Sequence, residues 1–148
     1  MSLYAPHKPK PLHDLRIDAK RLRYALELFS PCWEGKLNAY ANEVAGLQTA
    51  LGELHDCDVW IESLGHNLRA AHDERYADEA ALTLSARARD NERRAALWLL
   101  RHFAKERTRH YRAALARWHA WENFRLLAHL RGLIAATDEQ PTRRQAER

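Results

Sequence analysis

The stretch from Ala80 to Trp118 restricts the fold more than any other part of the sequence. It contains neither proline nor glycine, and its apolar residues keep a helical period throughout. It therefore predicts one helix of unusual length, or two helices joined by a kink. The whole chain favours helices, because it has five Gly, five Pro and few of the β-branched residues that build strands. We expect an all-α protein with a single domain, an antiparallel bundle of about four to five helices that includes one long helix.

The first half of the chain predicts two helices after an irregular start. Residues 1–11 hold three prolines, which predicts an extended lead-in. A first helix is expected from His13 to Phe29, followed by helix breakers between 30 and 35. A second helix is expected over 37–54, with a buried face made of regularly spaced apolar residues: Leu37, Tyr40, Ala41, Val44, Leu47, Leu51 and Leu54.

Beyond residue 54 the sequence predicts a third helix, a short last helix and a tail. Asp56 or Asp58 could cap a third helix that runs towards His72. A short last helix is expected over 121–134, with Trp121, Phe124 and Leu127 packed inside. The mixed charge and proline of residues 137–148 predict a disordered tail.

The charge is unevenly distributed along the chain. Residues 1–85 hold 9 Lys and Arg against 13 Asp and Glu, whereas residues 86–148 hold 15 against 7. This polarity favours an anionic partner for particular faces. The two cysteines are too few for a disulfide framework, and neither a signal sequence nor an apolar run long enough for a membrane span is present. The expected location is therefore the cytoplasm, without a membrane.

The first helix carries a row of basic residues on one face. At 100° per residue, His13, Arg16, Lys20 and Arg23 share a narrow arc that spans about 15 Å of helix, a spacing suited to successive phosphates of an extended chain. We call these four residues the first basic stripe. A solvated charged face is the alternative interpretation of such a stripe.

The residues on either side of the first basic stripe favour a binding site over that alternative. Ile17, Tyr24 and Leu28 form a second apolar strip, so the stripe would have packing surface on both sides, as in a groove. Asp18 and Arg21, three residues apart, fall on the remaining face and predict a surface ion pair rather than a ligand contact.

The spacing of the first basic stripe recurs in the long helical stretch. His102, Lys105, Arg109 and Arg112 repeat it, and Arg87, Arg94 and Arg101 extend the same face at seven-residue intervals, with Trp98 among them. This second basic stripe is either a second wall of the same site or a chance recurrence in an arginine-rich chain.

Two sequence segments, HDLRIDAKRLRYALELF and LQTALGELHDCDVW, resemble the CHAD domain, the conserved-histidine α-helical family. The resemblance covers residues 12–60 and implies a helical bundle over 12–136 that binds inorganic polyphosphate through a basic channel, with some relatives located at polyphosphate granules. His13, Arg16, Lys20 and Arg23 are the matching basic positions. Tyr24 and the 52–56 turn, which includes His55, match the pattern without a defined role.

The resemblance also bears on oligomeric state. The family's full module consists of two related halves, whereas this chain has the clear motif once, in the form typical of the second half. A half-module could complete itself as a homodimer about a twofold axis.

The remaining patterns argue against catalysis. The cluster from Glu53 to Asp58 looks like a metal site, but consecutive residues seldom point at one centre. The Glu-x-Glu pattern of triphosphatase domains, which are fused to some relatives, is absent, and so are a glycine-rich phosphate loop and a nucleophile elbow. We therefore expect non-catalytic polyphosphate binding with no cofactor or metal. A nucleic-acid-binding module is the alternative, and a metal-dependent phosphohydrolase is less favoured.

Overall fold

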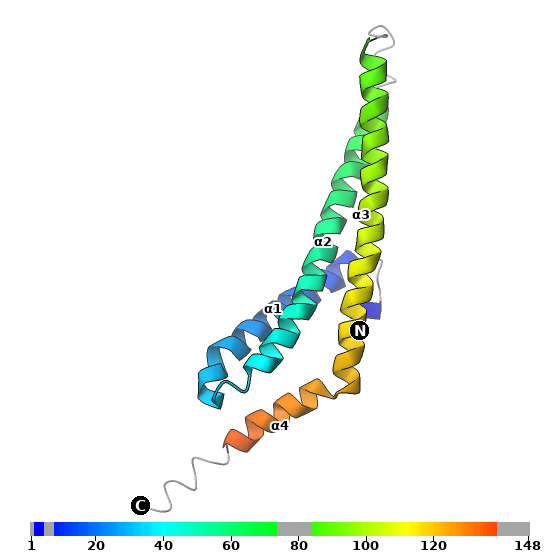
Figure 1. The fold of residues 1–148 in the computed structure, drawn as a ribbon. Coiled ribbons are helices and arrows are strands. Elements are labelled where there is room, and N and C mark those ends of the chain that lie inside the picture. The colour runs from blue at the N-terminus through cyan, green and yellow to red at the C-terminus, as the bar shows by residue number, and fades with distance from the viewer. Residues whose placement is uncertain (1, 5–7, 74–83, 139–148) are drawn as a thin grey trace, which may run out of the picture. The chain divides into compact units, whose positions relative to one another are not determined.

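The computed structural model describes residues 2–4, 8–73 and 84–138. They form a short 3-10 helix, η1 (Ser2–Tyr4), then α1 (Pro9–Phe29), a second 3-10 helix, η2 (Ser30–Trp33), α2 (Asn38–Asp73), α3 (Leu84–Asn123) and α4 (Leu126–Asp138) (Figure 1). The described residues include no strand. This confirms an all-α fold with four α-helices, of which α3, at 40 residues, is the expected long one.

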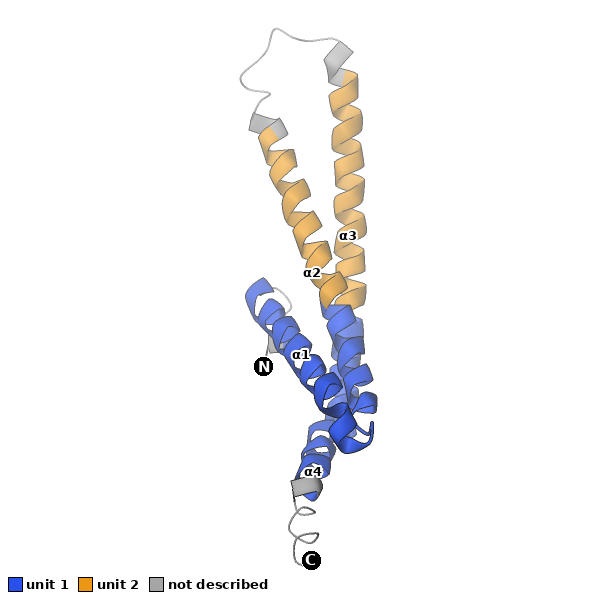
Figure 2. Ribbon diagram, turned by 90° about the vertical axis from the view of Figure 1, so that its left-hand side faces the viewer, with its two compact units in different colours: residues 1–51, 112–148 blue, residues 52–111 orange. Residues whose placement is uncertain are grey.

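The chain divides into two compact units, coloured separately in Figure 2. Unit 1 comprises residues 1–51 and 112–148, and unit 2 comprises residues 52–111. The boundary falls inside α2 and inside α3, so each of these helices contributes one part to each unit. The helices expected in one domain over residues 12–136 are thus distributed over two compact units. Within the described residues, no helix is long and apolar enough to cross a membrane.

Helix α1 begins earlier than the sequence suggested. Residues 9–11, expected in the extended lead-in, form its first turn, with Pro9 as the first helical residue and Lys8 as an extended N-cap. The amides of a first helical turn have no partner inside the helix, so Pro9 and Pro11 lose no hydrogen bond there. Prolines can therefore start a helix as well as prevent one.

A tight turn joins α1 to α2. The Ser30 amide donates to the Glu27 carbonyl, and η2 follows directly. Gly35 has a φ of 79°, a left-handed conformation that glycine adopts without strain. Its amide donates to the Ser30 carbonyl at 2.9 Å. This closed turn makes α1 and the first part of α2 a helical hairpin (Figure 1).

The core of unit 1 is formed by leucine-rich faces of several helices. The second-helix face predicted from the sequence is confirmed, with Leu37, Ala41, Val44, Leu47 and Leu51 buried and Tyr40 half-buried. The other buried residues of unit 1 are Leu3, Leu12, Ala19, Leu26, Ser30, Ala50, Ala114, Trp121 and Leu130.

Helix α1 presents a slightly different face to this core than the sequence predicted. Leu12, Ala19 and Leu26 are its buried residues, whereas Phe29 is exposed. The centre of the buried face is therefore displaced by about 40° around the helix, towards the basic arc. The basic residues nearest to the core gain partial burial as a result.

Helix α2 continues through the expected boundary at His55 and Asp56. The sequence-based prediction of a separate third helix is wrong, because Leu51, Leu54 and Cys57 keep the apolar face in phase across this point. A single glycine, Gly52, does not end a helix whose packing face is continuous. The aspartates that suggested an N-cap lie inside the helix.

Unit 2 is a hairpin made of the second part of α2 and the first part of α3 (Figure 2). Leu54 and Cys57 are buried, and Ile61, Leu64 and Leu68 continue the same face of α2 as half-buried residues. This spacing of three and four residues is that of a coiled-coil seam.

Two side-chain contacts join the helices of unit 2. Arg107 forms an ion pair with Asp58, and each of these side chains is 21% exposed. The rings of Trp60 and Phe103 stack with centroids 5.6 Å apart and an interplanar angle of 5°. Both contacts pair α2 with the side of α3 that includes Phe103.

The end of α3 lies later than expected. Trp121, predicted in the last helix, is a buried residue of α3, and the chain turns at Arg125, which has a φ of 49°. The predicted packing of Phe124 and Leu127 is wrong, since both are exposed. The sequence offers no glycine or proline at this turn, so nothing marked its position. Of the tail expected to be disordered, residues 139–148 lie outside the described part of the chain.

Candidate functional site

The first basic stripe lies on α1 in unit 1, and we now call it the α1 stripe (His13, Arg16, Lys20 and Arg23). His13 and Lys20 are exposed, while Arg16 and Arg23 are half-buried. The difference follows from the displaced core face, because the two arginines occupy the edge of the arc nearest to Leu12, Ala19 and Leu26. Their aliphatic stems can pack on apolar neighbours while their guanidinium groups remain accessible.

Tyr24 lies beside two of the stripe's cations. The Lys20 ammonium lies 5.7 Å from the centre of the Tyr24 ring, and the Arg23 guanidinium carbon lies 4.8 Å from it. The ring face attracts both positive charges. Tyr24 therefore contacts two of the four stripe residues through its ring.

The second apolar strip expected beside the stripe does not pack against the described part of the chain. Ile17 is half-buried, but Tyr24 is exposed and Leu28 is 73% exposed. The prediction of packing surface on both sides of the stripe is wrong, because α1 buries one continuous face rather than two. The stripe is bordered by the core on one side only.

Glu27 ends the α1 stripe and was missed by the sequence analysis. It falls on the same arc as Lys20, and its Oε1 atom lies 3.6 Å from Arg23 Nε. That nitrogen is buried and makes no hydrogen bond to any described residue. The i, i+4 spacing of Arg23 and Glu27 could have revealed the pair. The carboxylate neutralises part of the charge at this end of the stripe.

The predicted ion pair between Asp18 and Arg21 is confirmed. Arg21 Nη1 and Asp18 Oδ1 lie 3.6 Å apart, and both side chains are largely exposed. By contrast, Arg16 and Lys20 form no ion pair with any residue in the described ranges. The α1 stripe thus keeps at least two cations that no carboxylate of the described residues balances.

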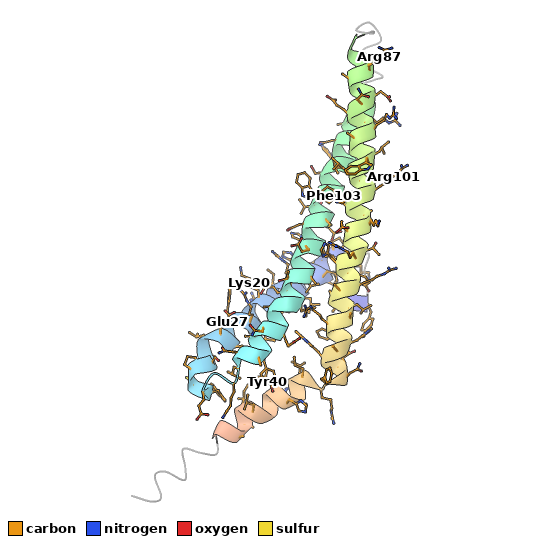
Figure 3. All side chains as sticks on the ribbon, in the orientation of Figure 1. Lys20, Glu27, Tyr40, Arg87, Arg101 and Phe103 are labelled. Carbon is orange, nitrogen blue, oxygen red and sulfur yellow. The ribbon has the colours of Figure 1, made fainter. Side chains whose placement is uncertain are left out.

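The second basic stripe lies along α3, and we call it the α3 stripe. Its members are all exposed: Arg87, Arg94, Arg101, His102, Lys105, Arg109 and Arg112. Figure 3 shows Arg87 and Arg101 on the side of α3 away from α2, with Phe103 on the side towards it. Arg109 pairs with Glu106 at 2.6 Å.

The α3 stripe does not share a compact unit with the α1 stripe. Residues 87–109 belong to unit 2, whereas Arg112 and the whole α1 stripe belong to unit 1. A two-walled site built from both stripes therefore stays a prediction.

An aromatic ladder on unit 2 is the largest feature that the sequence analysis missed. Trp60 stacks on Phe103, and the ring of His102 meets the edge of the Phe103 ring with centroids 5.4 Å apart. Trp98 stacks on His102 with ring centroids 5.6 Å apart and an interplanar angle of 7°. The spacing of Trp98 and His102 was visible in the sequence. The stack of Trp60 on Phe103 depends on the pairing of α2 with α3, so the sequence did not reveal it.

His55, part of the 52–56 segment that the CHAD resemblance singled out, is half-buried and lies within α2. Nearby, burial and then the carboxylates of Glu106 and Asp58 raise the pKa of the Cys57 thiol, which disfavours its thiolate form. No three potential metal ligands gather among residues 2–4, 8–73 and 84–138.

Comparison with known proteins gives one match. The family model of the CHAD domain matches residues 2–65, somewhat less than half of the chain. No curated protein and no solved structure matches the sequence. The matched segment includes α1 with its stripe and most of α2, and CHAD domains are linked in general to polyphosphate binding. Residues 2–65 of this chain are therefore similar to the CHAD domain family.

Proposed function

We propose that this protein binds inorganic polyphosphate through the α1 stripe and does not hydrolyse it. The observation that carries the proposal is the placement of four basic side chains on one face of α1, where Arg16 and Lys20 have no ion-pair partner in the described part of the chain. Like charges held close together repel one another, and a polyanion relieves that repulsion. The family match covers the whole stripe and supports polyphosphate as the polyanion.

The stripe suits an extended chain of phosphates better than a single phosphate ion. Its members follow one another along about 15 Å of helix, so consecutive phosphoryl groups can each meet a cation. Arg16 offers a planar guanidinium for two hydrogen bonds, while Lys20 offers a compact point charge. Tyr24 restricts the motion of Lys20 and Arg23 and lowers the entropy lost on binding.

Single substitutions test the proposal. Arg16→Ala and Lys20→Ala should each weaken the binding of long-chain polyphosphate about fivefold to tenfold and reduce its salt dependence, because each removes one phosphate contact. Arg21→Ala is the matched control, since Arg21 lies on the same helix and already pairs with Asp18. Fluorescence anisotropy over a salt series measures both quantities. Equal losses for all three variants would show that net charge alone matters.

Two further measurements address the alternatives. Single-stranded RNA that displaced polyphosphate from the wild-type protein at equal phosphate concentration, with the same sensitivity to Arg16→Ala, would make the stripe a nucleic-acid site. Release of inorganic phosphate on addition of Mg²⁺ or Mn²⁺ would contradict binding without turnover and favour a phosphohydrolase.

Oligomeric state and location belong to the same proposal. A second copy would supply the other half of a CHAD module, so we propose a homodimer in the presence of polyphosphate. Light scattering that finds a polyphosphate-bound monomer contradicts it. In cells, we propose a cytoplasmic protein that associates with polyphosphate granules, and a fluorescent fusion that stays diffuse when granules form argues against that association.

A further inference from the structure

The aromatic ladder of unit 2 is open to solvent at both ends. Trp98 is 64% exposed and Trp60 is 53% exposed, although each tryptophan has one ring stacked against it. Large aromatic side chains are normally covered, because their burial contributes much of the stability of a fold. Two exposed tryptophans joined through Phe103 and His102 therefore form a surface on which another flat ring could stack.

Cations surround the outer end of this ladder. Arg94 precedes Trp98 by one helical turn and Arg101 follows it by three residues, so both are neighbours of Trp98 on the helix surface. Lys105 lies two turns after Trp98 on the same side. All three are exposed, and none forms an ion pair among the described residues.

We propose that this surface binds single-stranded nucleic acid, with bases stacked on Trp98 and Trp60 and phosphates held by Arg94, Arg101 and Lys105. Proteins that bind single strands combine these two elements, an aromatic platform for the bases and cations that follow the backbone. Polyphosphate has no ring to stack, so it leaves the tryptophans uncovered. The site is separate from the α1 stripe and does not depend on polyphosphate binding.

The charges around Trp98 favour a nucleic acid over a second copy of the chain. A self-interface centred on Trp98 would bring Arg94, Arg101 and Lys105 of two copies together, and such like-charge contacts oppose association. A polyanion that carries aromatic rings satisfies both the tryptophans and the cations. A dimer that depends on Trp98 would contradict this choice of ligand.

The test separates bases from phosphates. Fluorescence anisotropy compares an oligodeoxythymidine of about 20 nucleotides with an abasic oligomer of the same length and charge. The wild-type protein should bind the base-containing strand at least about tenfold more tightly, because stacking adds to the phosphate contacts. Quenching of tryptophan fluorescence should accompany that binding. Equal affinity for the two oligomers would overturn the proposal.

Variants locate the effect. Trp98→Ala should reduce affinity for the base-containing strand about tenfold and leave the abasic strand unchanged. Leu97→Ala, at the adjacent exposed position of α3, is the matched control and should change neither. Trp98→Phe keeps a ring in place and should retain most of the difference between the strands, which preserves the test if the alanine variant does not fold.

Two results would contradict the site. One is an identical loss for Trp98→Ala and Leu97→Ala on the base-containing strand. The other is a wild-type dimer that Trp98→Ala converts to a monomer while oligonucleotide affinity stays the same, because the ladder would then be a contact between copies. Failure of this site leaves the α1 stripe untouched, since no variant used here alters α1.

Discussion

The α1 and α3 stripes have the same spacing of a histidine and three basic residues but different surroundings. On α1, Arg16 and Arg23 are half-buried beside the core of unit 1, and Lys20 and Arg23 lie against Tyr24. On α3, every member of the stripe is exposed, and Figure 3 shows Arg87 and Arg101 on the side away from α2. The α1 stripe is a short row ended by Glu27, whereas the α3 stripe continues for several turns and includes an exposed tryptophan.

The difference shows that spacing alone does not define a binding site. A period of three and four residues places cations on one face of any helix. The neighbouring side chains then decide whether those cations are held in place or move freely, and what else the ligand contacts. This difference supports our proposals that the α1 stripe binds polyphosphate and that the α3 surface around Trp98 binds single-stranded nucleic acid.

Substitutions at the contacts of Arg107 and at Arg101 compare the stability contributed by the two sides of α3, the one facing α2 and the one facing away from it. Asp58→Ala removes the ion pair between Asp58 and the partly buried Arg107 and should lower the free energy of unfolding by about 2 kcal/mol, less than for a fully buried pair because both side chains keep some exposure. Arg101→Ala, on the outer side, should cost less than about 0.5 kcal/mol. Urea denaturation measures both. Equal losses would mean that α3 has no distinct inner side in unit 2.

The reactivities of the two cysteines compare an exposed position of unit 1 with a buried position of unit 2. Cys32, exposed in unit 1, should react with a thiol reagent at least about tenfold faster than the buried Cys57 of unit 2 at neutral pH. The pKa of Cys57 is raised in the folded protein, so folding favours the protonated thiol. The stability that Cys57 contributes is present below its ordinary pKa and is lost as the pH rises through its folded pKa, where the thiolate forms. Labelling of Cys57 should therefore accelerate in alkaline solution.

Cys32→Ser and Cys57→Ser variants identify the two reaction phases. A Cys57 thiol that reacts as fast as Cys32 in the folded protein would show that the hairpin of unit 2 is open around Leu54 and Cys57.

Removing one carboxylate charge next to each stripe should change polyphosphate affinity by a smaller amount. Glu27→Gln frees Arg23 and removes a negative charge from the end of the α1 stripe, so polyphosphate should bind about threefold more tightly. Glu106→Gln frees Arg109 on α3 and should leave polyphosphate affinity within about twofold of the wild type, because we propose the α1 stripe as the polyphosphate site. Isothermal titration gives both values. A larger gain for Glu106→Gln would reverse the assignment of the two stripes.

The sequence predicted the parts of the fold that depend on periodic burial. The apolar face of α2 and the long α3 both follow from residues whose spacing repeats over many turns, and the Asp18–Arg21 pair follows from local spacing. The basic residues of α1 were recognised for the same reason.

The errors arose where a local signal competed with continuous packing. Asp56 resembles an N-cap, yet α2 continues through it because Leu54 and Cys57 extend the buried face. The end of α3 has no glycine, and Arg125 adopts the left-handed conformation instead. The Trp60–Phe103 stack joins residues far apart in the chain, which no single-helix pattern reveals.

The measurement that tests the central claim most directly compares polyphosphate affinity after removal of two charges from each stripe. Arg16→Ala/Lys20→Ala and Arg94→Ala/Arg101→Ala each remove two positive charges, from α1 and from α3 respectively. The α1 double variant should bind long-chain polyphosphate about 30-fold more weakly than the wild type, and the α3 double variant less than about threefold more weakly. Equal losses, or a larger loss for the α3 variant, would contradict the assignment of polyphosphate to α1.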